Sequence, residues 1–290
     1  MKLITFTHKN KTRVGAVVDN QVVDSTGSEA IPNDMLAFLQ AGNSALQAMQ
    51  QLINSSTTRL DLATVKLEAP INNPQKFLGI GLNYADHISE TQLEKPEYPL
   101  FFNKQVNCIT AHNSPIYLPH TSDKVDYEGE LAFIIGKRCR NVPIERAHEV
   151  IAGFSIVNDV SVRDWQMRSP TWTLGKSFDT HGPIGPWIVT TDEITDPHHL
   201  QLTTWVDGEQ RQSANTQQMI FNCYEMIVYL SSTMTLEAGD IISTGTPSGV
   251  GVKMKPRGYL KAGQVVKIEI ENIGVLSNPV IDEPEARILI

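Results

Sequence analysis

The chain has 290 residues, with 24 lysines and arginines against 32 aspartates and glutamates, and a formal net charge of −8. An acidic chain without a basic stripe disfavours nucleic acid and anionic membranes as partners, because both are bound through cationic groups. The longest apolar stretches, such as Leu131–Ile135, are strand-sized, and no apolar signal-peptide core opens the sequence. Three widely spaced cysteines indicate a reducing compartment. We therefore expect a cytoplasmic globular protein.

The first seventy residues predict a small α+β unit. Two short runs near the N-terminus alternate apolar and polar residues, as strands do, with turn residues between them. Asn33 is placed to cap a helix over residues 35–42, and a second helical pattern covers residues 44–54. A short linker follows, and a new apolar strand begins after it. We expect a domain of residues 1–70 and a second domain of residues 71–290.

The second part of the chain has mainly the pattern of β-strands. The clearest strand patterns lie at residues 131–136, 153–159, 202–212 and 264–274. Helical patterns interrupt them at residues 144–153 and 216–234. Because strands and helices do not alternate regularly, a doubly wound parallel sheet is disfavoured. The pattern predicts a mixed, β-rich barrel or sandwich with peripheral helices.

The strongest chemical signal is the pair Glu128 and Glu130, separated by one glycine at the start of an apolar strand. Side chains two apart in a strand share a face and lie about 6.6 Å apart along the chain. Two carboxylates so placed repel one another and are costly to bury unless a cation lies between them. Carboxylate oxygens without nearby cysteine or histidine favour Mg²⁺, Mn²⁺ or Ca²⁺ over Zn²⁺. The alternative is a solvated edge-strand face.

Other positions could complete such a site. Asp159 ends an apolar strand and could ligate a metal or form a turn. Lys176, among apolar and small residues, could hold an oxyanion, act as a base, or lie on the surface. His87 and Glu90 share a helical face and could activate water or form an ordinary surface pair. The loop at residues 244–249 could bind a carboxylate or be a plain turn.

Five segments stand out together, namely GLNYADH, DYEGELAFIIGKR, AGFSIVNDVSVRDWQ, TLGKSFDTHGPIGP and GDIISTGTPSGVG. These segments resemble the signature blocks of the fumarylacetoacetate hydrolase family. They occur in the family's order between about residues 76 and 274, or about two thirds of the chain. The first seventy residues resemble the small variable domain that many members carry.

The resemblance implies a β-rich roll or sandwich around a divalent cation, Mg²⁺ or Mn²⁺ with Ca²⁺ as a further option, in a homodimer. It implies that Glu128, Glu130 and Asp159 are the metal ligands. It also implies a substrate-side lysine and a water-activating pair on a lid. We place the lid at about residues 86–98, which are polar and lack core-sized apolar residues, so the lid should pack weakly without ligand. Lys176, His87 and Glu90 match these catalytic positions, Arg163, Gln166 and Thr246 match substrate contacts, and Thr180 matches a group supporting the metal site.

The resemblance also implies the reaction class. Acylpyruvase-like and diketo-acid hydrolase-like members are metal-dependent hydrolases that cleave a C–C bond in a 2-oxo acid of the acylpyruvate, fumarylpyruvate or diketo-deoxy sugar acid type. Such a substrate would come from aromatic or sugar-acid breakdown. The alternatives are an oxaloacetate-type decarboxylase, a 2-hydroxymuconate-type isomerase, or a non-catalytic binding protein that keeps the fold.

Overall fold

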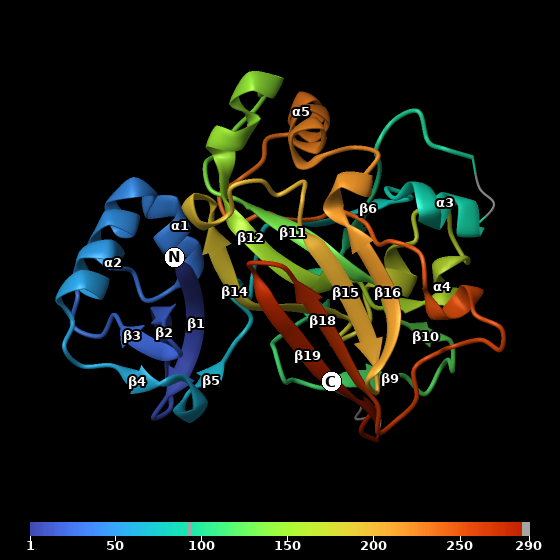
Figure 1. Cartoon of the computed structure of the whole chain (residues 1–290), viewed down its shortest axis with the longest axis horizontal. Coiled ribbons are helices and arrows are strands. Elements are labelled where there is room, and N and C mark those ends of the chain that lie inside the picture. Colours follow the sequence, from blue (N-terminus) through green and yellow to red (C-terminus); the bar gives the residue numbers. More distant parts are fainter. Residues whose placement is uncertain (92–93, 286–290) are drawn as a thin grey trace, which may run out of the picture.

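Two packed sheets form most of the computed structural model, which describes residues 1–91 and 94–285 (Figure 1). The larger sheet has the order β4-β3-β2-β1-β14-β12-β11-β17-β6-β7, with β5 paired to β1 and β8 to β14. Its strands are β1 (Lys2–His8), β2 (Lys11–Val18), β3 (Gln21–Asp24), β4 (Leu60–Asp61), β5 (Lys66–Leu67), β6 (Phe77–Gly81), β7 (Leu100–Lys104), β8 (Ile109–Thr110), β11 (Gly129–Ile135), β12 (Ile151–Asn158), β14 (Gly182–Thr190) and β17 (Ile241–Ser243).

The second sheet has the order β16-β15-β18-β19-β9, and β10 and β13 form a separate two-stranded ribbon. These strands are β9 (Ile116–Leu118), β10 (Val125–Asp126), β13 (Ser161–Val162), β15 (Gln201–Val206), β16 (Glu209–Asn215), β18 (Val265–Ile270) and β19 (Gly274–Asp282). The α-helices are α1 (Met35–Ala41), α2 (Asn43–Ser55), α3 (Ala85–Thr91), α4 (Arg163–Gln166) and α5 (Cys223–Thr233). None of the helices in the described part of the chain combines the length and apolar character needed to span a bilayer. The expectation of a β-rich mixed fold with few helices is confirmed.

The central strand β11 is buried on both faces, because its alternating side chains enter two different apolar clusters. Leu131 and Phe133 belong to the cluster between the two sheets, which also holds Leu202 of β15 and Ile268 of β18. Ala132 points the other way, into a cluster that includes side chains of α1 and α2. Alternation of this kind puts residues of odd and even number on opposite faces of a strand. The same alternation puts the side chains of Glu128 and Glu130 on one face.

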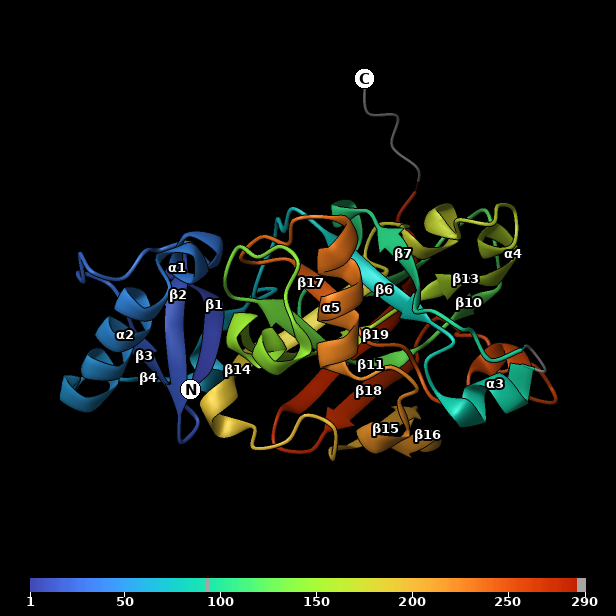
Figure 2. The same ribbon diagram turned by 90° about the horizontal axis from the view of Figure 1, so that it is seen from above.

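The N-terminal strands continue the larger sheet, since Lys2 and Leu3 of β1 pair with Val189 and Ile188 of β14. Helices α1 and α2 lie together at one end of the molecule in Figures 1 and 2. The small α+β unit therefore shares its sheet with the rest of the chain. The domain boundary near residue 70 stays a prediction.

Three helix predictions need correction. Helix α1 is capped by Asp34, whose side chain accepts a hydrogen bond from the Ala37 amide, and Asn33 lies one residue too early. The pattern at residues 144–153 forms a 3₁₀ helix over Ile144–Val150, and strand β12 begins directly after it. The remaining 3₁₀ segments are Leu62–Thr64, Val106–Cys108, Thr173–Lys176, Thr191–Glu193, Thr216–Gln218 and Gly251–Lys253.

The helix expected at residues 216–234 is interrupted. Its first part is the 3₁₀ turn Thr216–Gln218, and α5 begins only at Cys223. The side chain of Asn222 accepts from the Glu225 amide, and the Glu225 side chain accepts from the Asn222 amide, which forms a capping box. These reciprocal hydrogen bonds start a new helix inside a continuous helical pattern.

The topology gathers several strand ends at one edge of the large sheet. Strands β11 and β12 are antiparallel with Gly129 opposite Asn158, so the start of β11 meets the end of β12. Strand β17 is antiparallel to β11 and parallel to β6, so β17 and β6 end at the same edge. Helix α3 follows β6, and both views show α3 and α4 at the end of the molecule far from α1 and α2 (Figure 2).

Candidate active site

Three buried carboxylates converge at this edge. One oxygen each from Glu128, Glu130 and Asp159 can be chosen so that all three lie within 4.8 Å of one another. The strand register explains the convergence, and the Asp159 amide donates to the Glu128 carbonyl oxygen at 2.9 Å. The solvated edge-strand alternative is wrong, since all three side chains are buried. An arrangement of hard oxygen donors at this spacing suits a divalent cation such as Mg²⁺ or Mn²⁺.

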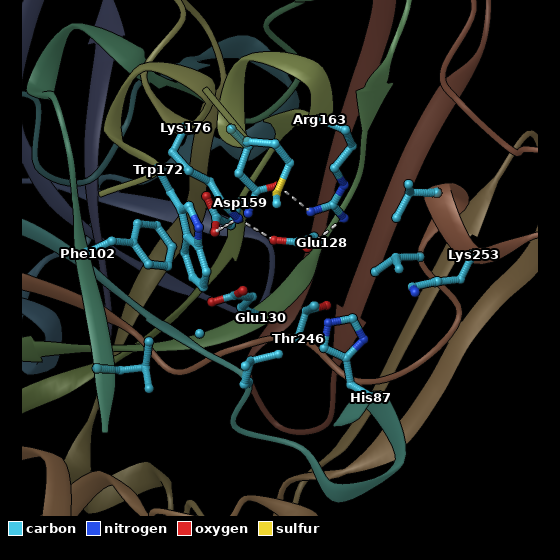
Figure 3. A pocket seen from close by; sticks show the side chains of 17 residues that line it. His87, Phe102, Glu128, Glu130, Asp159, Arg163, Trp172, Lys176, Thr246 and Lys253 are labelled. Atoms are coloured by element: carbon cyan, nitrogen blue, oxygen red, sulfur yellow. Dashed lines mark hydrogen bonds and ion pairs between the residues drawn. The ribbon is translucent and has the colours of Figure 1, made fainter. Parts of the chain in front are cut away.

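Two buried lysines, Lys104 and Lys176, lie against the carboxylates, and Figure 3 shows Lys176 beside Asp159 and Glu128. The Lys176 ammonium is 2.5 Å from an oxygen of Glu128 and 2.5 Å from an oxygen of Asp159. With 2% of its surface exposed, Lys176 is not the surface lysine of the alternative interpretation. The Lys104 ammonium donates to the other Asp159 oxygen at 2.7 Å and to the Lys176 carbonyl oxygen at 2.5 Å. The sequence did not identify Lys104 as a site residue, because the pattern LFFNK at residues 100–104 is equally typical of a strand that ends in an exposed lysine.

The electrostatics of the carboxylates are unequal. Burial alone would raise the pKa of Glu128, but the Arg163 guanidinium and the Lys176 ammonium outweigh it and hold that pKa well below its usual range. Burial, together with the neighbouring charges of Asp159 and Glu128, raises the pKa of Glu130 well above its usual value. The negative charges of Asp159 and Glu128 thus disfavour the ionised form of Glu130. A bound cation would offset this repulsion.

Arg163 fastens Glu128 from the side of α4. Its guanidinium donates to Glu128 at 2.7 Å, to Asp126 at 2.8 Å and to the Gln166 side chain at 3.0 Å. Arg163 and Gln166 both line the cavity, as the resemblance implies for substrate contacts. In this arrangement Arg163 positions one carboxylate of the triad, and direct contact with a substrate stays a prediction for both residues.

The pair of His87 and Glu90 forms on α3 as expected. The His87 Nδ1 lies 3.1 Å from a Glu90 oxygen, and the other Glu90 oxygen accepts from the Gly249 amide at 3.1 Å. Figure 3 shows the imidazole pointing from α3 into the cavity, towards the carboxylates. Donation by Nδ1 to Glu90 would leave Nε2 as the acceptor that a base needs.

The expected weak packing of the lid is wrong for its first turn. His87 is 8% exposed and Ile88 is buried, while the Ser248 hydroxyl donates to Asp86 at 2.7 Å. Helix α3 is therefore held against the loop that follows β17. Residues 92–93 of the expected lid lie outside the described residues.

The loop at residues 244–249 holds protein groups in place. The Gly245 amide donates to Glu130 at 2.9 Å, and the Ser243 hydroxyl just before the loop donates to the same oxygen at 2.5 Å. The Thr246 hydroxyl donates to the Gly129 carbonyl oxygen at 3.1 Å, and Thr246 also lines the cavity. Thr180 is not among the described lining residues, and its hydroxyl accepts from the Tyr117 amide. Its support of the metal site stays a prediction.

The carboxylates open into a cavity of about 460 Å³. One wall is apolar: the Phe102 and Trp172 rings meet edge to face with centroids 5.7 Å apart, and Figure 3 shows both beside Glu130 and Lys176. The lining residues are Ile80, Gly81, Leu82, His87, Phe102, Glu128, Glu130, Asp159, Arg163, Gln166, Met167, Trp172, Lys176, Thr246, Val250, Val252 and Lys253. A cavity that combines carboxylates, cations and an apolar wall suits a small organic acid bound through a metal.

Comparison with known proteins identifies the family of this chain. The fumarylacetoacetate (FAA) hydrolase C-terminal family model matches residues 76–281. The mitochondrial oxaloacetate tautomerase fahd2 of Xenopus laevis is 43% identical over 269 residues, which cover 92% of this chain and 83% of the relative. The chain belongs to the fumarylacetoacetate hydrolase family.

Two solved structures show the breadth of chemistry on this fold. Maleylpyruvate hydrolase from Sphingobium sp. SYK-6, in complex with manganese(II) ion and pyruvate, is 30% identical with a TM-score of 0.83, and the match covers 98% of this chain and 100% of that one. The 5-carboxymethyl-2-hydroxymuconate delta-isomerase from Mycobacterium smegmatis is 34% identical with a TM-score of 0.79, with the same coverage. The relatives thus include a tautomerase, a hydrolase and an isomerase, and the protein is an enzyme of this family.

Proposed function

We propose that this enzyme binds a 2-oxo acid through a divalent metal and catalyses its enolisation, with oxaloacetate keto–enol tautomerisation as the leading reaction. The observation that carries the proposal is the buried triad of Glu128, Glu130 and Asp159 in the same cavity as His87. The oxaloacetate tautomerase relative supports this substrate. C–C bond hydrolysis, the main expectation from the sequence, becomes the second candidate.

The metal site would consist of the three carboxylates. Their oxygen donors fit Mg²⁺ or Mn²⁺, with Ca²⁺ as a further option, and the manganese-bound relative favours the same class of ion. When bound, the cation supplies Lewis-acid polarisation of the 2-oxo group. Lys104, Arg163 and Ser243 hold the carboxylates in position by the contacts described above.

The chain's own residues would move the proton. His87, oriented by Glu90, takes a proton from C3, and the C3–H electron pair forms the C2–C3 double bond while the carbonyl electrons move onto O2. Return of the proton from His87 to O2 completes the enol, and the reverse sequence restores the ketone. Lys176 adds positive charge near the developing oxyanion. The reaction consumes no water and changes no net composition.

Hydrolysis of an acylpyruvate is the second candidate, because the same dyad can activate water. His87 would deprotonate a water that adds to the distal carbonyl carbon, and the bond from that carbon to C3 would break. The products are a carboxylic acid and the enolate of a 2-oxo acid, which then takes a proton at C3. The maleylpyruvate hydrolase relative favours this reaction. Decarboxylation of oxaloacetate requires the same enolate but no attacking water.

A substrate panel tests the proposal. The enzyme is loaded with Mg²⁺ or Mn²⁺ and incubated with oxaloacetate, acylpyruvates, fumarylpyruvate and diketo sugar acids, with a chelator-treated control. Enol absorbance reports tautomerisation, and product mass reports cleavage or loss of CO₂. We expect metal-dependent acceleration of oxaloacetate tautomerisation. Silence across the panel would overturn the proposal and favour a non-catalytic binding protein.

The remaining sequence predictions concern the setting of the enzyme. A small-molecule 2-oxo acid as the partner is part of the proposal. Homodimerisation, a cytoplasmic location and a role in aromatic catabolism stay predictions.

A further inference from the structure

Asn83 lies between strand β6 and helix α3 and is fully buried. Its side-chain oxygen accepts from the Phe221 amide at 2.8 Å, and its Nδ2 donates to the carbonyl oxygens of Phe221 at 3.0 Å and Thr244 at 2.8 Å. Its own carbonyl oxygen accepts from the Ile220 amide at 2.8 Å. Asn83 therefore joins three segments that are distant in the sequence: the turn before α3, the segment before α5, and the loop after β17.

The contact with Thr244 connects Asn83 to the carboxylate triad. The amide and the hydroxyl of Thr244 both donate to the Leu131 carbonyl oxygen at 2.9 Å, so Thr244 is fixed to β11 at the residue after Glu130. The next residue, Gly245, donates its amide to Glu130 and has a φ of +95°. A Cβ atom at Gly245 would lie 2.8 Å from the Asn83 Cβ atom, closer than two side chains tolerate. The loop that holds Glu130 is thus packed directly against Asn83.

Asn83 is also connected to His87, because α3 follows it directly. The Ile88 amide donates to the Tyr84 carbonyl oxygen at 3.0 Å, so the turn that carries His87 starts from the residue after Asn83. Tyr84 is fully buried and pairs with Met219 in an isolated β-bridge. The start of α3, and with it the imidazole, is therefore fixed by the segment that Asn83 holds.

We infer that Asn83 is a positioning residue that sets the distance between the base His87 and the metal site. The inference rests on the proposed function, which makes His87 the base. A planar amide suits this position, since it offers an acceptor and two donors to backbone groups, whereas an aspartate would place a carboxylate against two carbonyl oxygens. Displacement of a catalytic group by about 1 Å can lower a rate by about 10²-fold, even when the mutated residue lies away from the reacting atoms.

The test separates the placement of the base from substrate and metal binding. Asn83→Ala should lower kcat for oxaloacetate tautomerisation by about 10²-fold, because the imidazole is no longer held in place. The KM, the Mn²⁺ affinity and the affinity for 3,3-difluorooxaloacetate, which cannot enolise, should stay within about twofold. Metal-dependent decarboxylation should persist, because it does not need the base.

Asn83→Ser keeps one hydroxyl at this position and leaves a smaller void. It should show the same selectivity with a loss in kcat of about tenfold, and it carries the test if the alanine variant fails to fold. Equal losses of tautomerisation and decarboxylation, a weakened Mn²⁺ affinity, or an unchanged kcat in these variants would overturn the inference while the proposed function stands.

Asn278→Ala is the matched control for a purely structural role. Asn278 lies on β19, is also buried, and its Nδ2 also donates to two backbone carbonyl oxygens, those of Ala111 and Ser114, both at 2.8 Å. Its loss should lower the melting temperature but leave kcat within about twofold. A fall in kcat as large as that in Asn83→Ala would overturn the inference. A wild-type enzyme that does not tautomerise oxaloacetate with Mn²⁺ would instead overturn the proposed function, and with it the basis of the inference.

Discussion

The two sides of the cavity are built differently. Glu128, Glu130 and Asp159 stand at strand ends of a buried sheet, and lysine, arginine and loop groups hold each of them. His87 stands on a seven-residue helix that is tied to the neighbouring loop through Glu90 and Asp86. Under the proposed function, the sheet side would hold the metal and the helix side would supply the base. Related proteins include a tautomerase, a hydrolase and an isomerase, so we expect changes on the two sides to affect these reactions differently.

The largest effect is expected on the sheet side, from Glu130→Ala. Loss of one of the three proposed metal ligands should lower every activity by at least about 10³-fold, because Lewis-acid catalysis contributes several kcal/mol. The measurements are turnover at rising Mn²⁺ and metal affinity by calorimetry. Glu29→Ala removes an exposed carboxylate in the N-terminal unit and serves as the control. Unchanged metal affinity in Glu130→Ala would exclude this residue as a ligand.

A selective effect is expected on the helix side, from His87→Ala. Removal of the base should lower hydrolysis or tautomerisation by about 10²–10⁴-fold. Metal-dependent oxaloacetate decarboxylation should remain, because no water attacks and no C3 proton leaves. Rates are compared at saturating metal, with Ser89→Ala as a control, since the Ser89 hydroxyl donates to the helix backbone. Equal losses in all reactions would show that His87 positions the substrate.

The sequence predicted the candidate catalytic and metal-binding side chains on both sides of the cavity, but not the residues that support them. Strand alternation and a strand end singled out Glu128, Glu130 and Asp159 as candidates, and the family resemblance placed them in one metal site. Lys104 and Asp126 could not be located, since their partners lie far along the chain and only the folded sheet brings them together. The same limit applies to the fold: alternation predicted most strands, but the capping box at Asn222 interrupted a continuous helical pattern.

A broader loss is expected from Lys176→Met. This lysine touches Glu128 and Asp159, so its charge serves both the carboxylates and any oxyanion nearby. We expect all reactions to fall by about 10²-fold, the magnitude typical of one lost electrostatic donor. Thermal melting of the metal-loaded protein checks that the fold is retained. A loss confined to one reaction would contradict the view that the sheet side is common to all of them.

The smallest effect is expected from Glu90→Gln, which keeps the shape of the side chain and removes its charge. The amide oxygen can still accept from the Gly249 amide, so α3 should stay in place. The side-chain NH2 then faces His87 Nδ1, which loses its acceptor as well as the neighbouring charge, and we expect tautomerisation or hydrolysis to fall by about tenfold, below the 10²–10⁴-fold expected on removing the base itself.

Glu90→Ala separates charge from anchoring, because it also removes the acceptor for Gly249. If orientation of α3 is the main role of Glu90, only the alanine variant should lose activity, and its melting temperature should fall as well. If the charge matters, both variants should lose activity while decarboxylation persists in each. A decarboxylation rate that falls together with the other activities in Glu90→Gln would show that the helix side also controls the metal site, and the division between the two sides would then be wrong.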